Sequence, residues 1–134
     1  MMRHLVTVGV YGFTAERFLA TLERAGVDVL LDVRQRRGVR GSEYAWANSQ
    51  RLQAALDEAG IAYEHHPELA PEYRTRYIAE ILDQADLEAV AASLPESGAG
   101  ALFCVERDPE ACHRSLVAER LEAEHGVAVK HLRP

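Results

Sequence analysis

The sequence predicts a single α/β domain over residues 1–134, built as a three-layer αβα sandwich around a mostly parallel, five-stranded sheet. Five short apolar segments rich in β-branched residues alternate with segments whose apolar residues recur at helical spacing. This alternation favours parallel βαβ units, whose right-handed crossovers place helices on both faces of the sheet. The hydrophobic content of 48% and the charged content of 27% are typical of one globular domain.

The first strand and the first helix have clear end signals. The apolar run Leu5–Val10 predicts a strand that stops at a turn. Thr14 is a suitable N-cap for the helix that follows, and Gly26 is the kind of residue that ends a helix. The next apolar run, Val27–Val33, predicts a second strand that is buried on both faces.

A long connection over residues 35–48 interrupts the pattern. It contains glycines, several arginines and the only tryptophan. Connections of this length are unusual between a strand and a helix, and they are often functional. A helix then begins at Asn48 or Ser49 and ends at Gly60, and a third strand is predicted over Ile61–His66.

The second half of the chain predicts three more helices and two more strands. One helix covers Arg74–Leu82, and Asp86 caps another. The fourth strand is expected at Ala101–Val105. The next helix has Pro109 at its first position, where a missing N–H removes no hydrogen bond, and the last strand covers Val127–Leu132.

Polar residues follow each of the first four predicted strands. In open α/β sheets of the Rossmann or flavodoxin type, ligands bind at the carboxyl ends of the strands, which meet at one edge. We therefore expect these residues to converge on a polar cleft. The candidate site residues are Tyr11, Asp32, Arg34, His66, Glu106, Cys112, His113 and Arg114.

The leading hypothesis is a site for a phosphate-bearing ligand, either a nucleotide or a nucleic-acid end. Arg34 and Arg114 would bind the anion through their guanidinium forks. His113 would act as acid or base in hydrolase or transferase chemistry, with Asp32 or Glu106 orienting its ring. The alternative is that the two arginines pair with these carboxylates in a partly buried ionic network.

The arginine-rich loop over residues 34–46 supports a second hypothesis, a non-catalytic module that binds a protein or nucleic acid. The loop carries Arg36, Arg37 and Arg40 together with Tyr44 and Trp46. Mixed guanidinium and aromatic surfaces suit single-stranded nucleic acids. The competing interpretation is a solvated loop that Trp46 anchors to the core.

A third hypothesis is a thiol-dependent enzyme. A helix N-terminus and the neighbouring Arg114 would both lower the pKa of Cys112. The competing interpretation is that Cys112 is a small core residue. Two cysteines are too few for a disulfide framework, and we expect no structural bridge between Cys104 and Cys112 without a secretory signal.

Other classes of function are less compatible with the sequence. The formal net charge of −6 argues against general attraction to nucleic acids. No apolar run reaches the roughly 20 residues of a membrane helix, so we expect a cytoplasmic protein with no membrane partner. The candidate ligands His65, His66, Cys112, His113 and His131 lack the spacing of a metal site, and we expect neither metal nor cofactor. The sequence leaves the oligomeric state open.

Several motifs occur in the order known from one family. They are V-G-V-Y-G at 8–12, L-L-D-V-R at 30–34, G-I-A-Y-E-H-H-P-E-L at 60–69 and F-C-V-E-R-D-P-E-A-C-H-R at 103–114. The chain thus resembles the DUF488 family of uncharacterised proteins over nearly its whole length. The resemblance implies a small α/β domain without an established activity. It points to Asp32, Arg34, Glu106, Cys112, His113 and Arg114 as the shared site positions.

Overall fold

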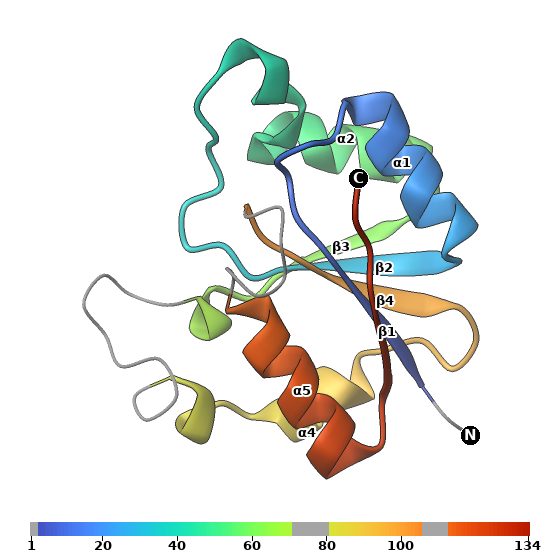
Figure 1. The fold of residues 1–134 in the computed structure, drawn as a ribbon, viewed down its shortest axis with the longest axis vertical. Helices are drawn as coiled ribbons and strands as arrows, with labels where there is room; N and C mark the ends of the chain where they lie inside the picture. The colour runs from blue at the N-terminus through green and yellow to red at the C-terminus, as the bar shows by residue number, and fades with distance from the viewer. Residues whose placement is uncertain (1–2, 71–80, 106–112) are drawn as a thin grey trace.

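A five-stranded parallel sheet between two layers of helices forms the fold in the computed structural model (Figure 1), which describes residues 3–70, 81–105 and 113–134. The strands are β1 (His4–Val8), β2 (Val27–Asp32), β3 (Ala62–His65), β4 (Ala99–Phe103) and β5 (Ala128–His131). Their order is β3-β2-β4-β1-β5, and every pair is parallel. The predicted three-layer α/β architecture is confirmed.

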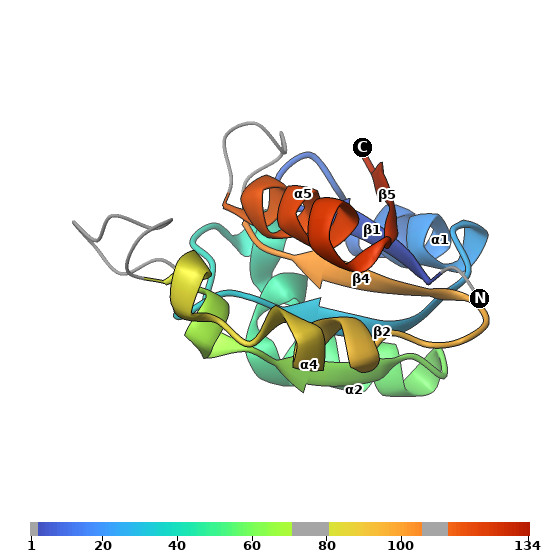
Figure 2. The ribbon, with the colours of Figure 1, turned by 90° about the horizontal axis from the view of Figure 1, so that it is seen from below.

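The helices divide between the two faces of the sheet (Figure 2). The α-helices are α1 (Ala15–Arg24), α2 (Ser49–Glu58), α4 (Leu87–Ala92) and α5 (Arg114–His125). Three short 3₁₀ helices are η1 (Ser42–Ala47), η2 (Pro67–Leu69) and η3 (Leu82–Gln84). Helices α1 and α2 cover one face, whereas α4 and α5 cover the other. Among the described helices, none is both long enough and apolar enough to cross a membrane.

Two apolar clusters fill the spaces between the sheet and its helices. Phe18 of α1 and Leu56 of α2 belong to one cluster, and Val117 and Leu121 of α5 belong to the other. Strand β4 is buried along its whole length, because it has strands on both sides and helices above and below. This burial explains why its sequence is continuously apolar instead of alternating.

Some predicted boundaries differ from those of the structure. Strand β4 begins and ends two residues before the predicted run Ala101–Val105, because Val105 belongs to a turn in which its carbonyl accepts the N–H groups of Val10 and Tyr11. Residues 74–80 of the predicted helix Arg74–Leu82 lie outside the described residues. The predicted helix start at Pro109 lies outside them as well. The long connection after β2 is not entirely irregular, since it contains η1.

The strand order determines where a ligand site is expected. Strand β2 leads to α2 on one face of the sheet, and its neighbour β4 leads to α5 on the opposite face. Adjacent strands whose connections diverge in this way leave a crevice between their carboxyl ends. The residues after β2 and β4 therefore occupy the position where α/β proteins bind ligands.

Candidate functional site at the carboxyl edge of the sheet

A buried ion pair lies at the end of β2. The Arg34 guanidinium donates from Nε to Asp32 Oδ1 and from Nη2 to Asp32 Oδ2, each at 2.8 Å. The Arg34 main-chain N–H also donates to Oδ1 at 3.1 Å. The Asp32 side chain is fully buried, and that of Arg34 is almost so. This two-pronged geometry is the strongest form of arginine–carboxylate contact.

The remaining contacts of Arg34 are also internal. Its Nη1 donates to the carbonyl of Ala47 at 2.9 Å, and the guanidinium carbon lies 4.7 Å from the centre of the Phe103 ring. All three guanidinium nitrogens thus form hydrogen bonds, and the group joins the two ends of the connection between β2 and α2. These contacts support the ionic-network interpretation of Arg34, and its predicted role as an anion ligand stays a prediction.

Tyr63 of β3 connects this ion pair to the surface. Its hydroxyl donates to Asp32 Oδ2 at 2.6 Å and accepts a hydrogen bond from Arg37 Nη1 at 3.3 Å. Burial, above all, raises the pKa of Tyr63, and its hydrogen bond to Asp32 acts in the same direction. The hydrogen bond to Tyr63 is the main cause that raises the pKa of Arg37. Arg37, Tyr63, Asp32 and Arg34 therefore form one chain from solvent to core.

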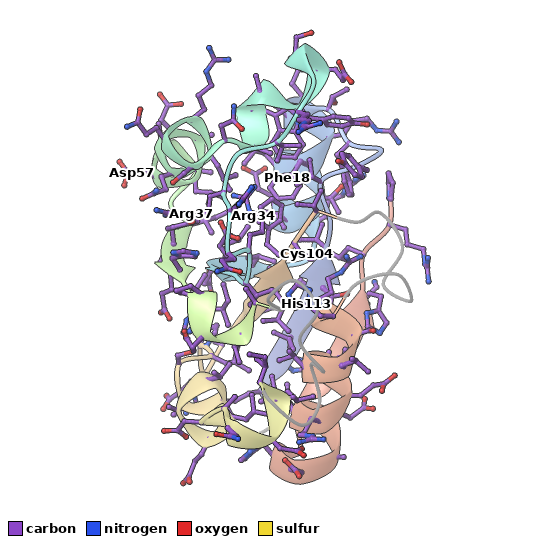
Figure 3. All side chains as sticks on the ribbon, turned by 90° about the vertical axis from the view of Figure 1, so that its left-hand side faces the viewer. Phe18, Arg34, Arg37, Asp57, Cys104 and His113 are labelled. Atoms are coloured by element: carbon purple, nitrogen blue, oxygen red, sulfur yellow. The ribbon has the colours of Figure 1, made fainter. Side chains whose placement is uncertain are left out.

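His113, the N-cap residue of α5, reaches the same region from the other face of the sheet. Its Nε2 lies 3.1 Å from the carbonyl oxygen of Val33, the residue after Asp32. A carbonyl only accepts hydrogen bonds, so Nε2 carries the proton and the neutral ring has its lone pair on Nδ1. Burial is the largest cause that lowers the pKa of His113, and the nearby Arg114 adds to it. His113 thus lies at the same edge of the sheet as Arg34 (Figure 3).

Arg114 is completely buried at the start of α5. Its Nη1 lies 2.9 Å from Cys104 Sγ. Cys104 takes part in a disulfide, so the expectation that it would form no bridge is wrong. The predicted site residues Glu106 and Cys112 lie outside the described residues.

Tyr11 and His66 have partners of their own at this edge. The Tyr11 ring packs against Tyr44, with 5.1 Å between the ring centres. The His66 ring lies between two carboxylates, with Nδ1 2.7 Å from Glu68 and Nε2 2.9 Å from Glu64. The His66 main chain contacts the buried ion pair through an N–H that donates to the Asp32 carbonyl at 2.8 Å.

An open hollow of about 620 Å³ lies beside Arg37, the outermost residue of the hydrogen-bond chain that leads to Asp32. Its lining combines the β2–α2 connection with the first turn of α2: Gln35, Arg37, Gly38, Asn48, Ser49, Gln50 and Arg51. The lining includes two guanidinium groups and no carboxylate. Among the described residues, neither Arg37 nor Arg51 forms a salt bridge.

Local hydrogen bonds determine the shape of this hollow. The Ser49 N–H donates to the Arg37 carbonyl at 3.1 Å, which fastens the loop to the start of α2. The side chain of Asn48, the N-cap residue, accepts from the Val39 N–H at 2.7 Å and does not cap the helix. The N–H groups of the first turn therefore receive no side-chain cap from Asn48.

Trp46 anchors the arginine-rich loop to the protein interior. Its ring lies 4.8 Å from that of Phe18, and it packs against the α1–α2 cluster. This contact supports the interpretation of the tryptophan as an anchor. Arg36 and Arg40, in contrast, are exposed. The loop thus has an apolar side that is buried and a basic side that faces solvent.

Local sequence patterns do not identify Tyr63, and they indicate His65 only as a candidate metal ligand. The His65 Nε2 donates to the Arg34 carbonyl at 2.6 Å, and its strand pairs with β2 so that His65 lies beside Asp32. The available signal was the alternation along β3, since Tyr63 and His65 are two residues apart and share a face. Across the described part of the chain, no three His, Cys, Asp or Glu side chains come together as metal ligands would.

These features define the protein as an α/β protein with an all-parallel sheet and a polar network at the carboxyl edge. Residues 14–121 match the family model of the domain of unknown function DUF488. The chain belongs to the DUF488 family, and the resemblance seen in the sequence motifs is confirmed. Neither the curated proteins nor the solved structures include a significant match.

Proposed function

We propose that this protein binds a phosphate-bearing ligand at the carboxyl edge of its sheet, with the anion in the hollow between Arg37 and Arg51. The observation that carries this proposal is the composition of the lining, which has two guanidinium groups and no carboxylate. Guanidinium forks match the geometry of phosphate oxygens. Arg34, whose nitrogens all have internal partners, holds the connection that carries Arg37 through its bond to the Ala47 carbonyl.

The surroundings favour a compact phosphate group over a polynucleotide strand. Single-stranded nucleic acids are bound by combining positive charge with aromatic rings on which bases stack. No aromatic side chain lines the hollow, and Trp46 packs against the core. We therefore favour a nucleotide or another small phosphate ester, with a nucleic-acid end as the larger alternative.

His113 is the best candidate for acid/base chemistry in a hydrolase or transferase reaction. Its Nε2 donates to the Val33 carbonyl, and its lowered pKa favours the neutral form of the ring at neutral pH. The Val33 carbonyl holds the ring at Nε2, and the orienting role expected of Asp32 or Glu106 stays a prediction. His113 does not line the hollow, so binding and chemistry are separate parts of the proposal.

Thermal unfolding with added phosphate tests the binding site. We expect inorganic phosphate to raise the Tm of the natural protein beyond the effect of sodium chloride at equal ionic strength, because a ligand that binds only the folded state stabilises it. The double variant Arg37→Ala/Arg51→Ala should lose this increment. Arg24→Ala, which removes an exposed arginine from the far end of α1, is the matched control. Equal increments in all three proteins would contradict the proposal.

The exposed side of the loop supports a second candidate, a non-catalytic interaction module. Arg36 and Arg40 are exposed and, among the described residues, form no salt bridge. A polyanionic partner, such as a nucleic acid or an acidic protein segment, would be attracted to them. Binding of a fluorescent single-stranded oligonucleotide that weakens in Arg36→Ala/Arg40→Ala, and not in Arg37→Ala/Arg51→Ala, would favour this candidate. The thiol-enzyme hypothesis needs a free thiol at Cys112, which lies outside the described residues, and the disulfide of Cys104 does not favour it.

A further inference from the structure

We propose that Tyr63 is the positioning residue that fixes Arg37 for an incoming phosphate group, so that the buried Asp32–Arg34 pair organises the binding site on the surface. This inference rests on the proposed phosphate site. It deepens that proposal, because it identifies how the site is oriented and which chemical class of ligand fits it. The chain of hydrogen bonds through Asp32, Tyr63 and Arg37 carries the argument.

The direction of each hydrogen bond in this chain is determined by chemistry. The Asp32 carboxylate only accepts, so the Tyr63 proton points toward Oδ2 at 2.6 Å. The phenolic oxygen then presents a lone pair to the outside, where Arg37 Nη1 donates to it at 3.3 Å. Tyr63 thus transmits the position of a buried carboxylate to an arginine at the surface.

Asp32 is a rigid starting point for this chain. Two guanidinium hydrogen bonds and one main-chain hydrogen bond from Arg34 hold its oxygens, and both side chains are buried. Arg37 is restrained at two points, through its side chain by Tyr63 and through its carbonyl by the Ser49 N–H. A long, flexible arginine that is held in advance loses less conformational entropy when it binds a ligand.

The same geometry restricts the class of ligand. Arg37 has five N–H donors, of which one is used by Tyr63, and the remainder only donate. Arg51, which also lines the hollow, adds further donors. A ligand group that satisfies this arrangement must be rich in acceptors and anionic. A terminal phosphate, whose three outer oxygens all accept, fits better than a single carboxylate.

A double-mutant cycle with inorganic phosphate as the probe tests this role. Calorimetric Kd values would be measured for the natural protein, Tyr63→Phe, Arg37→Ala and the double variant. We expect Tyr63→Phe to weaken phosphate binding by about fivefold in the natural background and to change nothing in the Arg37→Ala background. Ser93→Ala is the control, because it removes a hydroxyl that donates to the Val90 carbonyl within α4, on the other face of the sheet.

The outcomes separate this inference from the function on which it rests. If the natural protein does not bind phosphate, the proposed function fails. If it binds phosphate and Arg37→Ala weakens binding, but Tyr63→Phe retains full affinity, the positioning role alone is overturned. Should Tyr63→Phe not fold, Arg37→Lys replaces it: the charge stays while the fork is lost, and undiminished affinity would equally overturn the role.

Discussion

At the scale of single residues, the centre of this protein is the Asp32–Arg34 pair. Burying two charges is costly, and the cost is offset only where every donor and acceptor finds a good partner. Here the carboxylate receives hydrogen bonds from Arg34 and Tyr63, and the guanidinium also reaches the Ala47 carbonyl. The pair therefore fixes the geometry of the β2 carboxyl end more than it adds to stability.

His113 makes the stability of the protein depend on pH. In the unfolded chain its imidazole titrates near 6.5, whereas burial lowers its pKa in the folded protein. Between these two values the unfolded state binds more protons, so the free energy of unfolding rises with pH. This contribution levels off above 6.5, where the ring is neutral in both states.

His113→Gln should flatten that rise. The glutamine amide does not titrate, and it retains an N–H donor for the Val33 carbonyl. Urea unfolding at several pH values between about 5 and 8 measures the difference in slope between the two proteins. His4→Gln, which replaces an exposed histidine, is the control for the loss of an imidazole. Parallel pH profiles for the natural protein and His113→Gln would contradict the assignment.

At the scale of elements, two glycines at the ends of helices and strands differ in how well they would tolerate a side chain. Gly126 follows α5 with φ of 66°, and no atom lies within 4 Å of the position that a Cβ would take. Gly98 precedes β4 with φ of 85°, and a Cβ there would lie 2.9 Å from the Gly26 carbonyl oxygen. That carbonyl cannot move freely, because it accepts the Ala99 N–H at 2.8 Å.

Replacing each glycine with alanine should therefore give unequal losses. Gly126→Ala should lower the free energy of unfolding by about 1 kcal/mol, because alanine disfavours the left-handed backbone conformation. Gly98→Ala adds a steric clash to the same conformational cost, so we expect a loss at least about twice as large. Urea denaturation of both variants measures the difference. Equal losses would show that the turn before β4 adapts to a side chain.

The elements also show how far the sequence predicts this structure. Apolar runs and capping residues located all five strands and α1, α2, α4 and α5, because burial and local hydrogen bonds determine them. Asp32, Arg34 and His113 could be named as candidates because Asp32 ends β2, Arg34 lies just after it and His113 precedes α5. Tyr63 could not be predicted, because its contact with Asp32 depends on which strands pair and on where its side chain points. Local sequence patterns carry neither kind of information. The position of β4 between β1 and β2 was likewise beyond local patterns.

At the scale of the whole molecule, the sheet couples two apolar clusters that do not otherwise share residues. Neighbouring residues of β1 point to opposite faces, so Leu5 packs with α5 while Val6 packs with α1. Strand β4, at the centre of the sheet, is buried by both layers. If the helices on one face separate from the sheet, water reaches the hydrogen bonds between its strands. The cluster on the other face packs against those same strands. We infer that the domain unfolds as one cooperative unit.

The single tryptophan permits a direct test of this coupling. Trp46 reports on the α1–α2 cluster, whereas Leu121 is fully buried in the α4–α5 cluster on the opposite face. Leu121→Ala should cost about 2–5 kcal/mol, and Leu56→Ala, on the side of Trp46, a similar amount. In both variants the Trp46 fluorescence and the far-ultraviolet circular dichroism should report the same urea midpoint. If Leu121→Ala shifts the circular dichroism midpoint while the Trp46 fluorescence midpoint stays at its natural value, the two faces unfold independently. In that case the sheet is a shared support for two units, and the rigidity that we ascribe to the carboxyl edge has to come from the β2–α2 side alone.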